Sequence, residues 1–230
     1  MRDRLTAPPI LALDSATAAC SAAVLSGGGI VARRFVPMAT GHAQLLVPLI
    51  EAVMAESGVA FPALDHIAVT VGPGAFTGLR VGLAAAQGVA LASGKPIGGV
   101  TTLEAIARAV DAGVRQDAVL LVAIESKRRE LLVQSFAADL SPLDAPAAVL
   151  PEDLCAHVPP GALAVAGDAA IRAAEALAAG GRRASIMTGA VHPDAAHVAM
   201  VAAARLAAGG VLLPPRPLYL RAPDVTVARA

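Results

Sequence analysis

The sequence predicts an α/β protein built as a duplication, with one mixed sheet in each half. Short apolar runs alternate with helical patterns along the whole chain. The succession of strands and helices in the first half recurs less clearly in the second half, which indicates two copies of one α/β unit. A polar stretch at residues 111–117 separates the copies. We therefore expect an N-terminal half at residues 1–112 and a C-terminal half with a proline-rich tail at residues 113–230.

Five strands are expected in the first half. Three apolar runs joined by short turns predict an antiparallel meander at residues 8–14, 19–26 and 30–36. The first of these strands is expected to end at Asp14. Residues 65–72 are apolar on both faces, as is typical of a central parallel strand. Residues 96–100 predict a short fifth strand.

Three helices are expected in the same half, at residues 40–57, 79–92 and 101–110. Thr40 is a candidate cap for the first helix. Pro48 is tolerated there if the helix begins near Gln44, because proline fits a first turn. The threonine pair 101–102 offers a cap for the third helix, with Glu104 as its early acid.

The second half predicts a similar series. Its apolar runs indicate strands at residues 118–126, 130–137, 147–150, 162–166 and 184–188. Its helical patterns fall at residues 151–158, 171–180 and 194–209.

Composition excludes several classes of protein. Hydrophobic residues make up 56% of the chain, which is ample for a core, yet no uninterrupted apolar run reaches the roughly 18 residues of a membrane span. Asp14 and the Pro8–Pro9 pair interrupt the N-terminal apolar patch, which argues against a secretion signal. Cys20 and Cys155 have no metal-ligand spacing, so we expect a reducing, cytoplasmic setting. Zero net charge and 2% aromatics do not suit a protein that holds RNA alone.

Asp14, Ser15 and Thr17 form the first candidate site. A carboxylate at the end of a first strand, followed by hydroxyl groups, suits a water-mediated magnesium contact and a phosphate contact. The alternative is that these residues only shape a tight turn. Both interpretations stay open from the residues alone.

The glycine-rich stretch at residues 71–80 is the second candidate. It lacks the lysine of a P-loop and the spacing of a dinucleotide fingerprint. We expect Phe76 to pack the loop onto the core and Thr77 to cap a helix whose free N–H groups could receive an anion. Small residues in that helix would let a second helix approach closely, and packing on its own sheet is the alternative; they are Gly82, Ala85, Ala86, Gly88 and Val89.

The histidines give no metal motif. A pair at i, i+4 with His42 would need histidine at position 46, where Leu46 stands. His157, His192 and His197 show no convergent acidic partners in the sequence, so each is expected at the surface. We expect no metal site.

Three stretches together resemble the TsaB (YeaZ) family. They are "ILALDSATAACSAAVL", "GHAQLLVPLI" and "VGPGAFTGLRVGLAAAQGVALASGKPIGGVTTLEAIA". The second half agrees more loosely, through "IESKRRELLVQSF" and "PLYLRAPDVT". Glu125, Lys127 and Leu132 depart from the residues usual in the family at those positions, so a role for this second motif does not carry over.

The resemblance implies a duplicated actin-like ATPase (ribonuclease H-like) fold. It also implies a non-catalytic subunit, without catalytic residues, in the synthesis of threonylcarbamoyladenosine on tRNAs that read codons starting with A. The catalytic paralogue, TsaD, carries an HxxxH metal pair that this chain lacks. The implied partners are a TsaD homologue, a TsaE homologue and, through the complex, tRNA, while the isolated chain could form a homodimer. ATP or ADP and magnesium would act only at the level of the complex.

The resemblance also suggests an interface on two helices. The candidate interface residues are His42, Leu45, Leu46, Leu49, Ile50, Val53, Arg80, Gly82, Ala85, Ala86 and Val89. An independent ATPase or small-molecule kinase, with Asp14 on magnesium, is the alternative function. A metalloprotease is less favoured, because the ligand pair is missing.

Overall fold

A computed structural model describes residues 8–115 and 117–220 of the chain. The first sheet has the strand order β3-β2-β1-β4-β5. Its strands are β1 (Ile10–Thr17), β2 (Ala19–Ser26), β3 (Gly29–Pro37), β4 (His66–Gly72) and β5 (Ile97–Thr101). The first three pair antiparallel, and β1, β4 and β5 pair parallel. The meander and the central parallel strand predicted from the sequence are both confirmed.

The second sheet repeats this arrangement. Its strands are β6 (Val119–Glu125), β7 (Leu131–Phe136), β8 (Ala147–Val149), β9 (Leu163–Ala166) and β10 (Ala184–Ile186). Read as β8-β7-β6-β9-β10, their order matches that of the first sheet, and again three strands pair antiparallel while the others pair parallel. The predicted duplication with one mixed sheet in each copy is confirmed.

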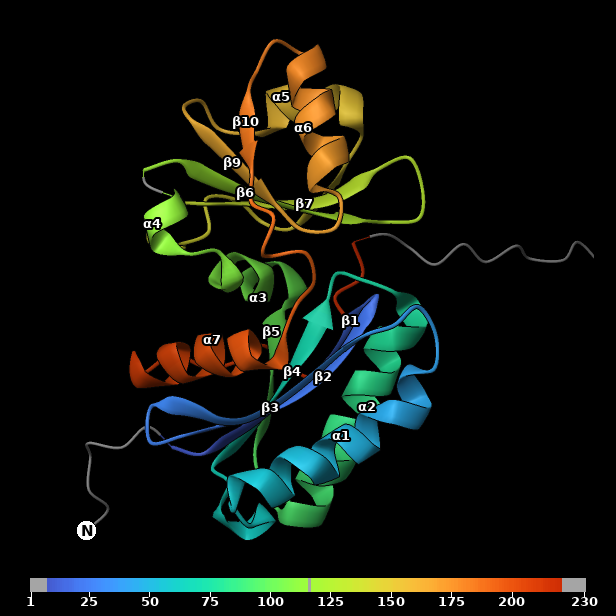
Figure 1. Cartoon of the computed structure of the whole chain (residues 1–230), viewed down its shortest axis with the longest axis vertical. Coiled ribbons are helices and arrows are strands. Elements are labelled where there is room, and N and C mark those ends of the chain that lie inside the picture. The colour runs from blue at the N-terminus through green and yellow to red at the C-terminus, as the bar shows by residue number, and fades with distance from the viewer. Residues whose placement is uncertain (1–7, 116, 221–230) are drawn as a thin grey trace, which may run out of the picture.

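The helices form layers around the two sheets, as Figure 1 shows. On one face of the first sheet lie α1 (His42–Ser57) and α2 (Phe76–Ser93). Between the sheets lie α7 (Ala195–Ala207), which packs on the first sheet, and α3 (Thr102–Ala109), which packs on the second. The outer face of the second sheet carries α5 (Leu154–His157) and α6 (Ala170–Ala179). The remaining short elements are α4 (Ala112–Arg115) and the 3-10 turns η1 (Phe61–Ala63) and η2 (Pro151–Asp153).

The location of α7 bears on the predicted division of the chain between residues 112 and 113. This helix comes from the C-terminal part of the sequence but covers the first sheet. The tail that follows it, residues 211–220, also returns to the first sheet, where Leu213 pairs with Gly99. The division into two domains stays a prediction, and both of these later segments pack against strands from before it.

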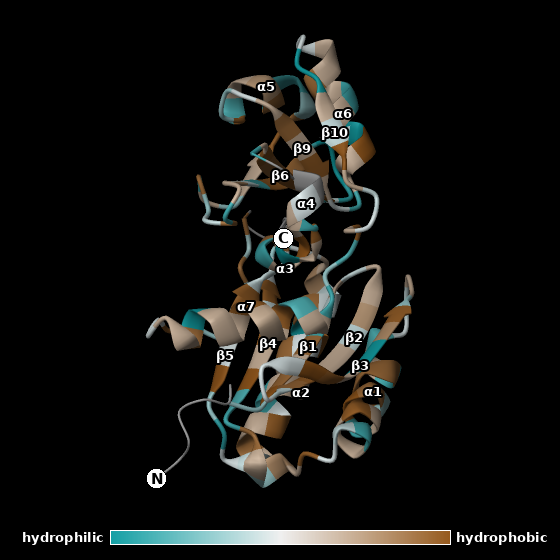
Figure 2. Cartoon of the chain, turned by 60° about the vertical axis from the view of Figure 1, so that its left-hand side comes forward, coloured by the Kyte–Doolittle hydropathy of each residue, from teal (hydrophilic) through white to brown (hydrophobic). Residues whose placement is uncertain are grey.

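The cores are aliphatic, as the composition predicts. Figure 2 shows hydrophobic residues concentrated in the strands and on the helix faces that cover them. Phe136 is the only aromatic residue among the largest fully buried side chains of the described chain. None of the described helices combines the length and the apolar character needed to cross a membrane.

Helix boundaries confirm one predicted cap, and they correct another together with the expected position of Pro48. Thr101 and Glu104 form a reciprocal capping box at the start of α3, as predicted. In contrast, α1 begins at His42 after Gly41, without a side-chain cap from Thr40. Pro48 therefore lies beyond the first turn, at an exposed position.

Candidate functional site: the cleft and the helical layer beside it

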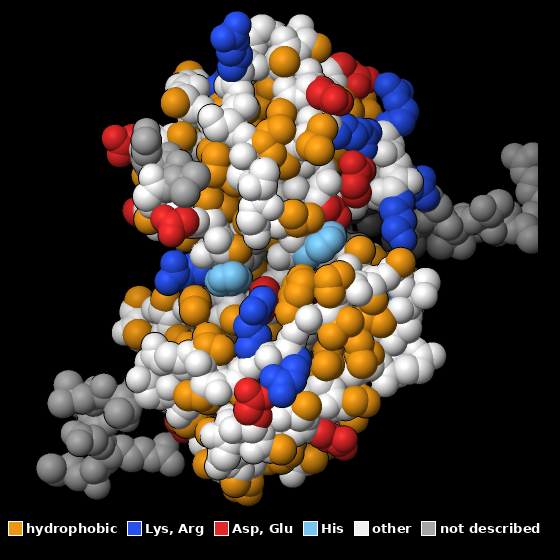
Figure 3. Space-filling model, viewed as in Figure 1, with side chains coloured by type: hydrophobic (Ala, Val, Ile, Leu, Met, Phe, Trp, Pro, Cys, Tyr) orange, Lys and Arg blue, Asp and Glu red, His pale blue; other side chains and the backbone are white. Residues whose placement is uncertain are grey.

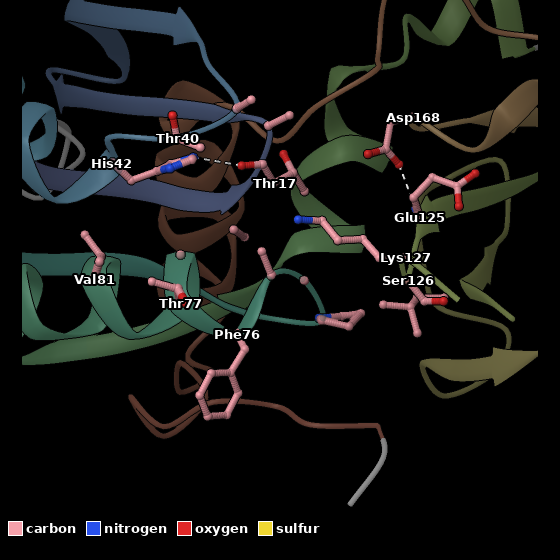
Figure 4. Close-up of a pocket in the computed structure, with 18 of the residues that line it drawn as sticks. Thr17, Thr40, His42, Phe76, Thr77, Val81, Glu125, Ser126, Lys127 and Asp168 are labelled. Atoms are coloured by element: carbon pink, nitrogen blue, oxygen red, sulfur yellow. Dashed lines mark hydrogen bonds between the residues drawn. The ribbon is translucent and has the colours of Figure 1, made fainter. Parts of the chain in front are cut away.

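A cleft of about 1070 Å³ opens between the two sheets, and Figure 4 shows the residues around it. On the first-sheet side its wall consists of the end of β1 with the residue that follows, the segment that leads into α1, and the glycine-rich loop with the start of α2. On the other side stand residues 125–128, Leu132 and Asp168. Leu218, Tyr219 and Leu220 of the tail complete the wall. Such a volume suits a small-molecule ligand.

Asp14 and Ser15, two of the three predicted nucleotide-site residues, do not line this cleft. Both are buried inside β1, which runs on to Thr17 instead of ending at Asp14. Side chains alternate along a strand, so Asp14 lies on the α7 side of the sheet together with Ile10 and Ala12. The predicted magnesium contact through Asp14 is therefore wrong for this structure.

Buried neighbours hold both side chains in place. Thr70 Oγ1 donates a hydrogen bond of 2.7 Å to Asp14 Oδ1, and the Ala16 N–H donates another of 3.2 Å. The second oxygen, Asp14 Oδ2, is buried without a partner among the described residues. Burial raises the pKa of Asp14 from its ordinary value of 3.8 to about 7, against the lowering effect of the Thr70 hydrogen bond. Ser15 Oγ donates to the Gly78 carbonyl at 2.8 Å.

Thr17 is the predicted residue that does reach the cleft. Its hydroxyl lies 3.2 Å from His192 Nδ1, and its carbonyl accepts a hydrogen bond of 2.9 Å from His42 Nε2. That bond requires a proton on His42 Nε2, so this nitrogen has no free lone pair for a metal ion. Figure 4 shows His42 directed toward Thr17. Among the described residues, no group of three or more metal-ligating side chains occurs.

His192, which was expected at the surface, makes a long-range contact there. It is partly buried and joins the segment before α7 to the last residue of β1, 175 residues earlier in the chain. Figure 3 shows histidine side chains at the junction between the two parts of the molecule. The sequence carried no signal for this contact, because its partner is so distant along the chain.

The glycine-rich loop serves the packing of α2 on β1. The helix starts at Phe76 after Ala75, and Thr77 lies inside it and does not cap it. The Ala75 N–H donates to the Ala16 carbonyl at 2.8 Å. A Cβ at Gly82 would lie 2.7 Å from Ser15 Oγ, so glycine at this position lets α2 approach the strand.

Phe76 was expected to pack the loop onto the core, and this expectation is also wrong. Its ring is 47% exposed and stacks on Tyr219 of the tail, with a centroid distance of 5.4 Å. The Arg80 guanidinium lies 3.8 Å above the Phe76 ring. Tyr219 is thus a residue of the cleft wall that sequence reasoning missed.

The predicted interface residues divide into two groups. Six face the core of the first sheet and cannot meet a partner helix while the fold is intact: Leu46, Leu49, Ile50, Val53, Gly82 and Ala86. The others are partly buried or exposed: His42, Leu45, Arg80, Ala85 and Val89. That α1 and α2 form an interface stays a prediction. The assignment of the six core-facing residues to this interface is wrong, because they lie on the helix faces that pack on the sheet.

The outward faces of α1 and α2 offer a different set of residues. Val47 of α1 is 50% exposed, and Leu91 of α2 is 88% exposed. Ala84 and Gly88, one turn apart on α2, are exposed, and a Cβ at Gly88 would meet nothing within 4 Å. Both helices pack on the same sheet face, so their outward faces form one surface, which we call the α1–α2 surface. Figure 3 shows hydrophobic side chains gathered on the side of the molecule where α1 lies.

The second-sheet wall of the cleft is charged. Lys127, in a left-handed backbone conformation with φ 60°, extends across the cleft toward Thr17 in Figure 4. No hydrogen bond or ion pair involves its amine within the described part of the chain. Asp168 Oδ1 accepts from the Glu125 N–H at 2.8 Å, and burial raises the pKa of Asp168. The Glu125 carboxylate pairs with Arg172 at 2.9 Å.

Comparison with known proteins identifies relatives of the chain. Residues 21–140 match the family model described as TsaD, tRNA N6-adenosine threonylcarbamoyltransferase. The tRNA threonylcarbamoyladenosine biosynthesis protein TsaB of Escherichia coli is 38% identical over 43% of this chain and 42% of the relative. TsaB of Haemophilus influenzae is 34% identical over 53% of this chain and 51% of the relative. The chain thus spans about half or less of the length of these two curated relatives.

Solved structures match a larger part of the chain. YeaZ from Pseudomonas aeruginosa has a TM-score of 0.75 and 29% identity, over 93% of this chain and 100% of that one. Component A of (R)-2-hydroxyglutaryl-CoA dehydratase from Acidaminococcus fermentans, with a TM-score of 0.50 and 12% identity, shares the fold alone. The two mixed sheets form the duplicated actin-like ATPase fold that was expected. Because the TsaD model matches half of the sequence and YeaZ matches almost all of the structure, the chain belongs to the TsaB (YeaZ) family.

Proposed function

We propose that this chain is a non-catalytic subunit in the synthesis of threonylcarbamoyladenosine on tRNA, and that it pairs with a TsaD homologue through the α1–α2 surface. The observation that carries the proposal is the membership of the TsaB (YeaZ) family, whose curated members are named for this biosynthesis. In this proposal a TsaE homologue and tRNA meet the chain only within the complex.

Two features of the chain support a non-catalytic role. Leu46 stands where a second histidine would complete a metal pair with His42, and its side chain is fully buried in the core of the first sheet. His42 Nε2 is already engaged as a donor to the Thr17 carbonyl. A metal ion held by helix α1 would require both of these contacts to be rebuilt.

The α1–α2 surface suits a helical partner. Its small residues Ala84 and Gly88 would let another helix approach closely, while Val47 and Leu91 would add apolar area to the contact. Phe76, the first residue of α2, lines the cleft, and Arg80 lies one turn further along this helix. A partner seated on this surface would therefore also border the cleft.

Titration of the purified chain with the TsaD homologue of the same organism tests the proposal. We expect Ala84→Leu combined with Gly88→Leu to weaken binding at least about tenfold, because a loss of 1.4 kcal/mol is sufficient for that. The matched control is Ala86→Leu on the same helix. Ala86 faces the sheet, so this variant should lose melting temperature while its affinity per folded molecule is unchanged. Unchanged binding of the double variant would refute the proposed surface.

The alternative is an independent ATPase or small-molecule kinase with Asp14 on magnesium. Asp14 is fully buried and does not line the cleft, so this alternative has no accessible acid at the predicted position. Steady-state ATP turnover by the purified chain separates the two functions. A rate well above about 1 per second would favour the independent enzyme.

A further inference from the structure

The tail at residues 211–220, here called the strap, extends the first sheet. Leu213 exchanges two backbone hydrogen bonds with Gly99: the Gly99 N–H donates at 2.7 Å, and the Leu213 N–H donates back at 3.0 Å. Gly99 belongs to β5, the edge strand of the sheet. The strap thus occupies a backbone edge that would otherwise be open for pairing.

Glycine in β5 makes this pairing possible. A Cβ at Gly98 would overlap the side chain of Leu212, so any larger residue would push the strap away from the edge. Farther along, the Leu218 N–H donates to the Val71 carbonyl at 2.7 Å, which attaches the strap to the end of β4 as well. The backbone contacts of Leu213 and Leu218 therefore both attach the strap to the first sheet.

The end of the strap reaches the cleft. Tyr219 stacks on Phe76, and Arg80 Nε donates to its hydroxyl at 3.1 Å. The chain has four Phe, one Tyr and no Trp, so this stack uses two of its few aromatic rings. The next residue, Leu220, packs against the core cluster that α3 forms with the second sheet, which includes Leu103 and Phe136.

We propose that the strap is a clamp that joins the two sheets on the cleft side and sets the width of the cleft. Leu213 and Leu218 attach it to the first sheet, Tyr219 to α2, and Leu220 to the cluster on the second sheet. The contact between α3 and α7 joins the sheets at the centre of the molecule. A second connection at the cleft limits the rotation of one sheet relative to the other. This inference is independent of the proposed function.

Amide hydrogen exchange reports directly on whether the strap is docked. The Gly99 amide donates to the strap and to no strand, so its protection requires the pairing with Leu213. We expect Gly98→Val and Tyr219→Ala each to accelerate exchange at Gly99 at least about tenfold, with exchange in β9 unchanged. Val211→Ser is the matched control, because Val211 lies in the strap but is 83% exposed. Equal protection of Gly99 in both variants and the control would overturn the docking part of the proposal.

A distance measurement tests the clamp itself. Spin labels at Glu51→Cys on α1 and Glu175→Cys on α6, both exposed, span the two sheets in a Cys155→Ser background. We expect Tyr219→Ala with Leu220→Ser to broaden the distance distribution, while Val211→Ser leaves it as in the parent protein. Because Tyr219 is partly exposed, circular dichroism should show an intact fold. An unchanged distribution in a folded variant with an unprotected Gly99 amide would refute the clamp.

Discussion

Asp14 lies inside strand β1 and not at its end, and this position decides its chemical environment. Strand β1 continues for three residues beyond Asp14, and the carboxylate is buried in the core beside α7. Burial then favours the protonated form, and the nearby Asp194 carboxylate acts in the same direction. Near neutral pH the ionised form of Asp14 opposes folding.

The first prediction concerns the pH dependence that follows. The pKa of Asp14 in the folded state, about 7, is above its ordinary value of 3.8, so the folded protein holds this proton over a pH range in which the unfolded chain has lost it. Stability should therefore fall as pH rises from about 4 to about 7. Asp14→Asn removes this titration. The free energy of unfolding of this variant, relative to that of the parent protein, should rise by a few kcal/mol between pH 4 and pH 8. Each pKa unit corresponds to about 1.4 kcal/mol. Urea unfolding of both proteins at the two pH values checks this, and parallel pH curves would contradict it.

The second prediction compares two glycines of α2. Gly88 is exposed, and a Cβ there meets nothing, so Gly88→Ala should raise the free energy of unfolding by about 0.5–1 kcal/mol through helix propensity. Gly82→Ala is the matched control on the same helix. Its Cβ would meet Ser15 Oγ at 2.7 Å, so we expect a loss of about 1–3 kcal/mol. Urea denaturation of both variants measures the difference. Effects of the same sign would show that the helix faces are wrongly assigned.

At the scale of elements, local signals predicted more than long-range ones. The capping box of α3, the meander of β1 to β3 and the hairpin of β6 and β7 depend on residues close in sequence, and all three are present. The faces of α1 and α2 were misassigned. Their sequences are apolar or small nearly all round, so periodicity could not separate the face toward the sheet from the face toward solvent.

The third prediction tests the start of α3. Thr101 Oγ1 accepts from the Glu104 N–H at 3.0 Å, so Thr101→Val should cost about 1 kcal/mol by removing the cap while keeping the side-chain shape. Thr102→Val is the neighbouring control. Thr102 Oγ1 is buried without a partner among the described residues, so its loss should be neutral or stabilising. Thermal unfolding of both variants is the measurement, and equal losses would mean that the capping box does not stabilise the helix.

At the scale of the whole molecule, the return of α7 to the first sheet could not be predicted from the sequence. An alanine-rich helix can cover either sheet, and only contacts distant in sequence select one of them. The Ala195 N–H donates to Ser21 Oγ on β2, and Arg205 of α7 pairs with Glu104 of α3. Likewise, Lys127 and Tyr219 of the cleft wall come from segments far apart in the sequence, so the sequence alone did not bring them together.

The last prediction concerns the ion pair between Arg33 and Asp194, two residues that are far apart in the sequence. Asp194 caps α7 through the Ala196 N–H and pairs with Arg33 of β3, 161 residues away, where Arg33 Nε donates at 2.8 Å. The Asp194 side chain is 5% exposed and that of Arg33 is 52% exposed, so solvent screens the pair only in part. Removing Arg33 would leave a buried carboxylate with fewer donors. We therefore expect a double-mutant cycle with Arg33→Ala and Asp194→Ala to give a coupling energy above about 1 kcal/mol.

The pair between Arg129 and Glu152 is the internal control for that cycle. Both of its side chains are exposed, and its distance is 2.7 Å, so its coupling should stay below about 0.5 kcal/mol despite the short contact. Amide exchange should separate the two pairs in the same way. Arg33→Ala should accelerate exchange along α7, because the helix loses its attachment to β3, whereas Arg129→Ala should leave α7 unchanged. Coupling energies of equal size in the two cycles, with α7 equally protected in both variants, would show that packing alone, without this ion pair, holds α7 on the first sheet.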